Sequence, residues 1–190
     1  MIGIRGLRVD VSTYSGEVNI LSDYPQVHLI LSADTQFLDR AFIALTQNPD
    51  YFVFEEASHK NAKIGFLRKQ DGLVDGLTVA ENIFLSNKHG FFLSKRGMSK
   101  TCARIFEEIG YYLPPNAQVS DLTASQRRFV EFYQIYLRKP DILVVNEATA
   151  NLSYKELIYF SRIIEKLKQQ GTSIYFFTTR CEDALRIGDI

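Results

Sequence analysis

The sequence lacks several features that would assign the chain to a function class. Its 22 basic and 22 acidic side chains give a formal net charge of zero, so there is no basic excess of the kind that favours a nucleic-acid surface. A transmembrane helix would need a run of about 18 apolar residues, and the sequence has none. The N-terminal MIGIRGLRVD carries charges within its apolar stretch, unlike a signal peptide. We therefore expect an intracellular chain that reaches a membrane only through a partner.

The sequence is also poor in residues that bind metals or form disulfides. Cys102 and Cys181 form no C-x-x-C pair, and Cys102 shares a helical face with apolar residues, so we expect it to be a buried apolar side chain. His28, His59 and His89 have no metal-ligand spacing. His28 lies inside an apolar strand pattern and is expected to be an ordinary strand residue.

What the chain does contain is typical of one α/β domain. With 46% hydrophobic residues over 190 positions, it can bury a sizeable core. Alternating polar and apolar residues from 3 to 21 predict antiparallel strands with a turn at 14–16. Val27 to Leu31 is a further strand, followed by Asp34 as an N-cap and an amphipathic helix.

A second group of elements surrounds residues 119–153. The spacing of Thr123 and Gln126 predicts a capping box, as does that of Ser153 and Glu156. Between them, the apolar run 142–145 is typical of a buried parallel strand, and a polar pair follows it. Open α/β sheets bind ligands at such strand ends. The other expected elements are strands at 51–54, 64–67 and 173–177, a short helix that begins with a third capping box at Thr78 and Glu81, helices at 98–112 and 153–170, and a last short helix that ends near Gly188.

Three segments carry a resemblance to a known family. They are LTVAENIFL at 77–85, LTASQ at 122–126 and NEATA at 146–150, which follows an apolar strand. Together they resemble ABC transporter ATPases, most closely those of sugar importers, in which L-S-x-G-Q begins a helix and a strand ends in D-E-P-T-A. The resemblance implies a P-loop NTPase-like ABC ATPase fold with a mainly parallel core sheet and an N-terminal antiparallel β region. It implies a single domain, 1–190, with its core at 1–85 and 122–190 and a helical subdomain at about 86–121.

The phosphate-binding end departs from the family pattern. Such a loop needs glycines whose amides cradle phosphates, a Lys, and a Ser or Thr for magnesium. The segment 32–39 contains no glycine. Within it, Ser32 is the first residue of the degenerate loop, Leu38 stands at the Lys position and Asp39 at the Ser/Thr position. Its carboxylates would repel a triphosphate, so an ordinary strand-to-helix connection is the better interpretation.

Other family positions are changed as well. By resemblance, Asn146 stands where the family has the Asp that holds magnesium, and Thr179 stands at the position of the switch His. Glu147 keeps the position of the catalytic base and is a vestigial catalytic candidate. The family's Q-loop glutamine corresponds to Lys69, with Gln70 one place later. The signature positions are held by Thr123, Ser125 and Gln126.

These departures predict a degenerate ABC-type subunit without ATP hydrolysis of its own. ATP and Mg²⁺ are family ligands but are not expected here. The implied role is structural or regulatory, in a sugar-type transport system, on the inner face of the cell membrane. The partner would be a permease subunit, contacted by Phe91 and Phe92 if these are exposed, or a second ATPase subunit, or a second copy of the chain. Two alternatives stay open: an unorthodox ATP-binding or slow ATPase subunit, and a repurposed non-transport binding module.

Overall fold

The computed structural model describes residues 2–11, 14–23, 25–54, 62–85 and 94–182. Within these ranges, no helix is both long and apolar enough to cross a membrane. The chain divides into two compact units. The first comprises 1–69, 140–148 and 167–190; the second comprises 70–139 and 149–166. The expected subdomain at 86–121 falls within the second unit, and Phe91 and Phe92 lie outside the described residues.

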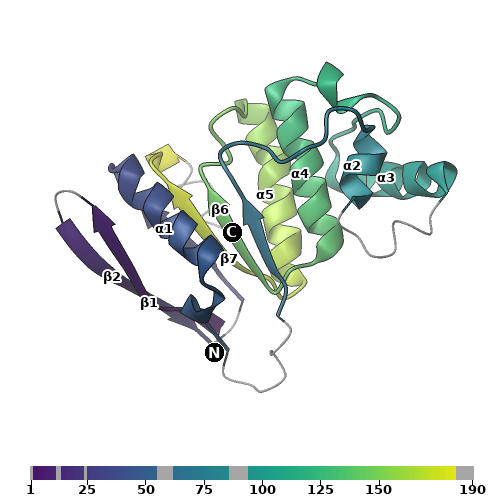
Figure 1. The fold of residues 1–190 in the computed structure, drawn as a ribbon. Coiled ribbons are helices and arrows are strands. Elements are labelled where there is room, and N and C mark those ends of the chain that lie inside the picture. Colours follow the sequence, from purple (N-terminus) through teal and green to yellow (C-terminus); the bar gives the residue numbers. More distant parts are fainter. Residues whose placement is uncertain (1, 12–13, 24, 55–61, 86–93, 183–190) are drawn as a thin grey trace. The chain divides into compact units, whose positions relative to one another are not determined.

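The first unit begins with an antiparallel sheet of order β2-β1-β4 (Figure 1). Strand β1 runs Ile2–Val11, β2 runs Tyr14–Ser22 and β4 runs Phe52–Phe54 after a 3₁₀ turn, η1, at Pro49–Tyr51. The turn expected at 14–16 is wrong, because those residues already pair with β1. The ladder shifts register between Ile4 and Leu7, where Gly6 adopts a φ of 66°, a conformation that glycine reaches without steric cost.

A parallel sheet of order β3-β7-β6-β5 forms the other layer of the first unit. Its strands are β3 (Val27–Leu31), β5 (Ile64–Leu67), β6 (Ile142–Asn146) and β7 (Ser173–Thr178). The two central strands, β6 and β7, are buried along their whole length, which explains their continuous apolar sequence. All four strands were expected at these places, to within one residue.

Helix α1 (Thr35–Gln47) supplies side chains to the core of the first unit. Its buried face consists of Leu38, Ala41, Phe42 and Leu45. These side chains belong to one cluster with β1 residues such as Leu7 and with β6 and β7 residues such as Val144 and Phe177. The helix therefore ties the two sheets of this unit together, and its N-terminus is fixed in position.

Helices make up the second unit. They are α2 (Val79–Phe84), α3 (Lys95–Ile109), α4 (Ala124–Arg138) and the greater part of α5 (Tyr154–Gln169), with a 3₁₀ turn, η4, at Val119–Asp121. All three predicted capping boxes are present, at Thr78, Thr123 and Ser153. Helix α3 ends earlier than expected, because Gly110 caps it with a φ of 88°.

The core of the second unit is aromatic. Phe129 of α4 stacks on Tyr111 with ring centroids 3.8 Å apart, and Phe132 lies 4.6 Å from Phe160 of α5. Cys102 is fully buried here, as expected, and burial raises the pKa of its thiol to about 12. A thiol with so high a pKa is a poor nucleophile or metal ligand near neutral pH.

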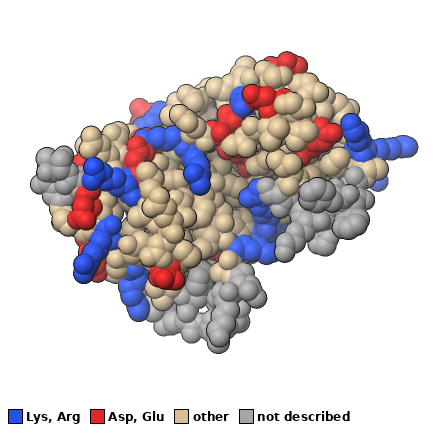
Figure 2. Space-filling view, in the orientation of Figure 1, with Lys and Arg blue, Asp and Glu red and all other residues tan. Residues whose placement is uncertain are grey.

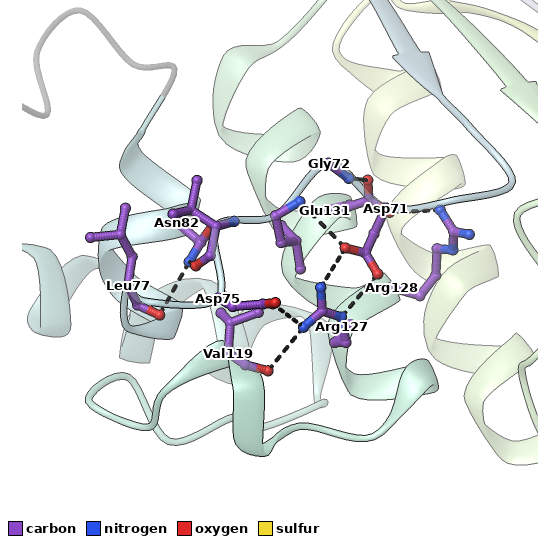
Figure 3. Close-up of polar contacts among 11 residues, drawn as sticks. Asp71, Gly72, Asp75, Leu77, Asn82, Val119, Arg127, Arg128 and Glu131 are labelled. Atoms are coloured by element: carbon purple, nitrogen blue, oxygen red, sulfur yellow. Dashed lines mark hydrogen bonds and ion pairs between the residues drawn. The ribbon is translucent and has the colours of Figure 1, made fainter.

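The loop from 71 to 78 in the second unit is held by three side chains of the helices (Figure 3). The Arg127 guanidinium binds both oxygens of Asp71, at 2.7 and 2.9 Å, and one oxygen of Asp75 at 2.6 Å. Glu131 accepts a hydrogen bond from the backbone amide of Gly72 at 3.1 Å. The fully buried Asn82 side chain bonds the loop backbone on both its amide oxygen and its amide nitrogen. Side chains of α2 and α4 therefore fix the position of the loop.

Candidate functional site

The carboxyl ends of three neighbouring parallel strands bring the candidate site together in the first unit. Strands β5, β6 and β7 are adjacent and in register. Lys69 follows β5 by two residues, Asn146 ends β6, and Thr179 follows β7 directly. Because parallel strands end at the same edge of a sheet, these side chains meet there. Asp39, from the first turns of α1, completes the group.

Lys69 is at the centre of the group. Its Nζ lies 2.9 Å from an oxygen of Asp39 and 2.7 Å from an oxygen of Glu147. The Glu147 side chain is only 15% exposed, whereas those of Lys69 and Asp39 are 35% and 42% exposed. One ammonium group therefore bridges two carboxylates, one of which is largely shielded from solvent.

Neighbouring polar groups complete the arrangement of the two carboxylates. The Asn146 amide nitrogen donates to Asp39 at 2.9 Å, and the Thr179 hydroxyl donates to Glu147 at 2.6 Å. Glu147 adopts a φ of 46°, and its backbone amide donates to Phe177 of β7. A left-handed backbone at a non-glycine residue is uncommon and often marks a functional position. Here it turns the chain out of β6 at the point where Glu147 meets Lys69.

These contacts keep all three ionisable groups charged at neutral pH. Burial alone would raise the pKa of Asp39, but the hydrogen bonds from Lys69 and Asn146 together hold it below its ordinary value. Glu147 behaves in the same way, with Lys69 and Thr179 as its donors. Burial would lower the pKa of Lys69, but the two carboxylates raise it instead. The site is therefore a cluster of two carboxylates and one ammonium group, with a net charge of −1.

A carboxylate of the chain itself caps the N-terminus of α1. The Asp34 carboxylate accepts hydrogen bonds from the backbone amides of Gln36 at 2.8 Å and Phe37 at 3.2 Å. The amide of Asp34 in turn donates to the Ser32 hydroxyl at 3.1 Å. Leu38 is fully buried in the core. The first free amides of the helix, which bind phosphates in other proteins, are thus bonded to a protein carboxylate.

The signature positions lie in the second unit, where they cap a helix. The Thr123 hydroxyl accepts from the Gln126 amide at 3.3 Å, and the Gln126 side chain accepts from the Thr123 amide at 2.9 Å. The Ser125 hydroxyl lies 3.2 Å from that of Thr123. Gln70 is exposed. Of the predicted site residues, the structure gathers Asp39, Lys69, Asn146, Glu147 and Thr179, and these three capping residues are not among them.

Solved structures share this architecture. A putative ABC transporter ATP-binding protein from Pyrococcus furiosus superposes with a TM-score of 0.72, covering 92% of this chain and 90% of that one, at 13% identity. A bacterial ABC transporter cassette solved as a dimer gives a TM-score of 0.71, covering 98% and 91%, at 15% identity. The fold is that of an ABC ATPase.

Sequence comparison gives distant similarity to ATP-binding proteins of sugar importers. A putative ribose/galactose/methyl galactoside import ATP-binding protein of Agrobacterium fabrum is 28% identical over the whole chain, which spans 40% of that protein. A ribose import ATP-binding protein of Rubrobacter xylanophilus is 32% identical over 70% of the chain and 27% of its own length. The chain thus spans two fifths or less of these relatives. No protein-family model matches it.

The site residues of this domain, which has the fold of an ABC ATPase, do not fit ATP and Mg²⁺. A nucleotide phosphate would compete with Asp34 for the α1 amides and would find Leu38 buried where a lysine would be needed. A magnesium ion would compete with Lys69 for both carboxylates. Among the residues that the structure describes, no three or more His, Cys, Asp or Glu side chains gather as a metal site.

One role was missed at the level of sequence. Asp34 caps α1 as predicted, but Lys69 was expected only as a changed Q-loop position. The signal for Lys69 was present, since a lysine just beyond one parallel strand can reach an acid at the end of the adjacent strand. This signal could be used only once the order of the strands was known.

On the face drawn in Figure 2, Lys and Arg side chains occur together with Asp and Glu side chains, as the balanced composition leads one to expect.

Proposed function

We propose that the chain is an ABC-type subunit that does not hydrolyse ATP itself and acts as a structural or regulatory partner in a sugar-type ABC transport system. The relatives named above support the sugar-type assignment. The proposed partner is a permease subunit, a second ATPase subunit or a second copy of the chain, at the inner face of the cell membrane. The observation that carries the loss of hydrolysis is the occupied N-terminus of α1.

The physical reason lies in what phosphoryl transfer requires. The protein's contribution to that reaction is positioning and charge stabilisation. Here the backbone amides are bonded to a carboxylate, and the site holds two acids to one lysine. Loss of a single electrostatic group commonly costs roughly 10²-fold or more in rate. With the cradle, the lysine and the magnesium carboxylate all replaced, turnover should fall below detection.

Calorimetric titration with Mg²⁺-ATP tests the proposal, alongside a phosphate-release assay with an active ABC ATPase as positive control. We expect no binding below about 1 mM and no phosphate release by the chain. The slow-ATPase alternative is favoured by the ionised Glu147 beside Thr179. Submicromolar binding, or phosphate release that Glu147→Gln abolishes and the exposed-site control Glu107→Gln leaves unchanged, would refute the proposal and support that alternative.

A further inference from the structure

The cluster at the strand ends contains the oxygen donors that a divalent cation prefers. Carboxylate and amide oxygens are the usual protein ligands of Mg²⁺ and Ca²⁺. Asp39 and Glu147 each place a carboxylate oxygen within 3.0 Å of the same point, which is the Nζ of Lys69. Asn146 is only 3% exposed, and its amide oxygen is buried without a hydrogen-bond partner. The amide nitrogen of the same side chain donates to Asp39, so Asn146 also contributes a polar group beside the acids.

The ammonium group of Lys69 stands at the centre of these oxygens. It contacts Asp39 through both carboxylate oxygens, at 2.9 and 3.0 Å, and Glu147 at 2.7 Å. Without it the two carboxylates would repel each other, and Glu147, at 15% exposed, has little access to solvent for screening. The Lys69 ammonium is thus the positive charge that offsets this repulsion.

We propose that Lys69 is a built-in counter-ion that takes the place of a divalent cation and makes this end of the sheet stable without a bound ion. Lys69 is supplied by the segment just after β5, Asp39 by α1 and Glu147 by the residue that follows β6. The lysine therefore joins three elements that are far apart in the sequence. The stability of this chain would then not depend on a metal ion, whereas a protein whose paired acids are held by an ion loses stability when the ion is removed.

The expected behaviour differs between variants in a way that ordinary ion-pair loss does not produce. Replacement of Lys69 by Met keeps the length of the side chain and removes its charge. The variant should melt about 4 °C or more below the unaltered chain in the presence of EDTA. Because its two acids are then free to share an ion, millimolar Mn²⁺ or Ca²⁺ should restore at least half of that loss. The unaltered chain should shift by less than about 1 °C under the same additions.

Thermal unfolding followed by circular dichroism, with and without divalent cations, provides the test. Lys69→Arg, which keeps the charge, should show no cation response. The double change Lys69→Met with Asp39→Asn removes one acid along with the lysine, so it should recover stability without an ion and lose the cation response. If the single variant does not fold, the double variant decides: a folded double variant supports the proposal, and an unfolded one overturns it.

The proposal is overturned if Lys69→Met melts at the temperature of the unaltered chain, or if Mn²⁺ stabilises both chains equally. It is also overturned if the double variant responds to Mn²⁺ as the single variant does, since the response would then not come from the paired acids. The result is independent of the proposed function. ATP turnover by the unaltered chain would refute that proposal and leave the melting comparison intact.

Discussion

Replacement of Asn82 by Asp tests how much the Asn82 hydrogen bonds to the 71–78 loop stabilise the protein. It changes only the amide NH₂ group, which becomes a carboxylate oxygen. Asn82 is fully buried at α2. Its amide oxygen accepts from the Val74 amide at 2.8 Å, and its amide nitrogen donates to the carbonyls of Val74, Leu77 and Thr78 at 3.0, 3.3 and 3.1 Å. Aspartate fills the same space and keeps the acceptor. It places a carboxylate oxygen against three carbonyl oxygens.

The size of the effect follows from the lost donors and the buried charge. Two N–H groups that bond three carbonyls contribute about 1 kcal/mol per donor. A carboxylate left in that position adds a desolvation cost of a few kcal/mol, because its new oxygen faces the carbonyls of Val74, Leu77 and Thr78. We therefore expect a loss of about 4 kcal/mol in the free energy of unfolding at pH 7. The burial and the carbonyls also raise the pKa of the introduced carboxyl, so the loss should shrink as the pH falls towards 5.

Urea denaturation followed by circular dichroism measures this loss, and amide hydrogen exchange at Val74 localises it. The urea midpoint should drop by more than about 1 M at an unchanged slope. Asn151→Asp, which adds the same charge at an exposed position of the second unit, is the matched control and should change stability by less than about 0.5 kcal/mol. A loss below about 1 kcal/mol, or one that is the same at pH 5 and pH 7, would refute the reasoning.

Three further predictions concern residues of the second unit, in one case with a glycine of the first unit as the comparison. The Arg127 guanidinium holds the pKa of Asp71 below its ordinary value, so the stability that this pair contributes is present above about pH 4 and is lost as the pH falls through the lower folded pKa. Asp71→Asn should therefore lower the melting temperature at pH 7 and make the melting temperature less dependent on pH in the acid range. Gly110→Ala should lower the free energy of unfolding more than Gly171→Ala. Both glycines have a positive φ, but of the two only Gly110 would bring an added Cβ close to another atom, Arg162 Nη1 at 2.8 Å. Equal losses in urea denaturation would contradict this. Phe160→Ala should cost about 3–5 kcal/mol, whereas Ile158→Ala on the same helix, 44% exposed, should cost less than about 1 kcal/mol; chemical denaturation of the two variants separates them.

Local signals in the sequence were sufficient for most elements of the fold. The capping boxes at Thr78, Thr123 and Ser153 are set by side chains three residues apart, and each predicted a helix start correctly. The apolar run of β6 needs no knowledge of its neighbours to be recognised as a buried strand. The turn at 14–16 failed for the opposite reason. Ser15 and Gly16 are typical of a turn, but pairing with β1 holds these residues in β2.

The candidate site was only half predictable. The sequence placed Asn146 and Glu147 at a strand end because the apolar run stops there. It could not show that Lys69 bridges Asp39 and Glu147, because that contact depends on β5 lying beside β6 and on α1 packing against the same layer. A resemblance assigns each position the role it has in relatives. It does not show which new partner a changed residue has acquired.

Introducing a single residue of the family pattern should not confer nucleotide binding. Leu38→Lys replaces a fully buried core side chain, so we expect a loss of several kcal/mol in stability and no gain in Mg²⁺-ATP affinity by calorimetry, while the amides of Gln36 and Phe37 remain bonded to Asp34. Ile43→Lys on the same helix, 49% exposed, should leave stability within about 0.5 kcal/mol. If Leu38→Lys alone bound Mg²⁺-ATP, the occupied helix N-terminus could not be what prevents binding. Because Asp34 caps the helix, Leu38 fills the core and Lys69 contacts both acids, each of these side chains has contacts of its own, and we expect phosphate binding to require several changes at once.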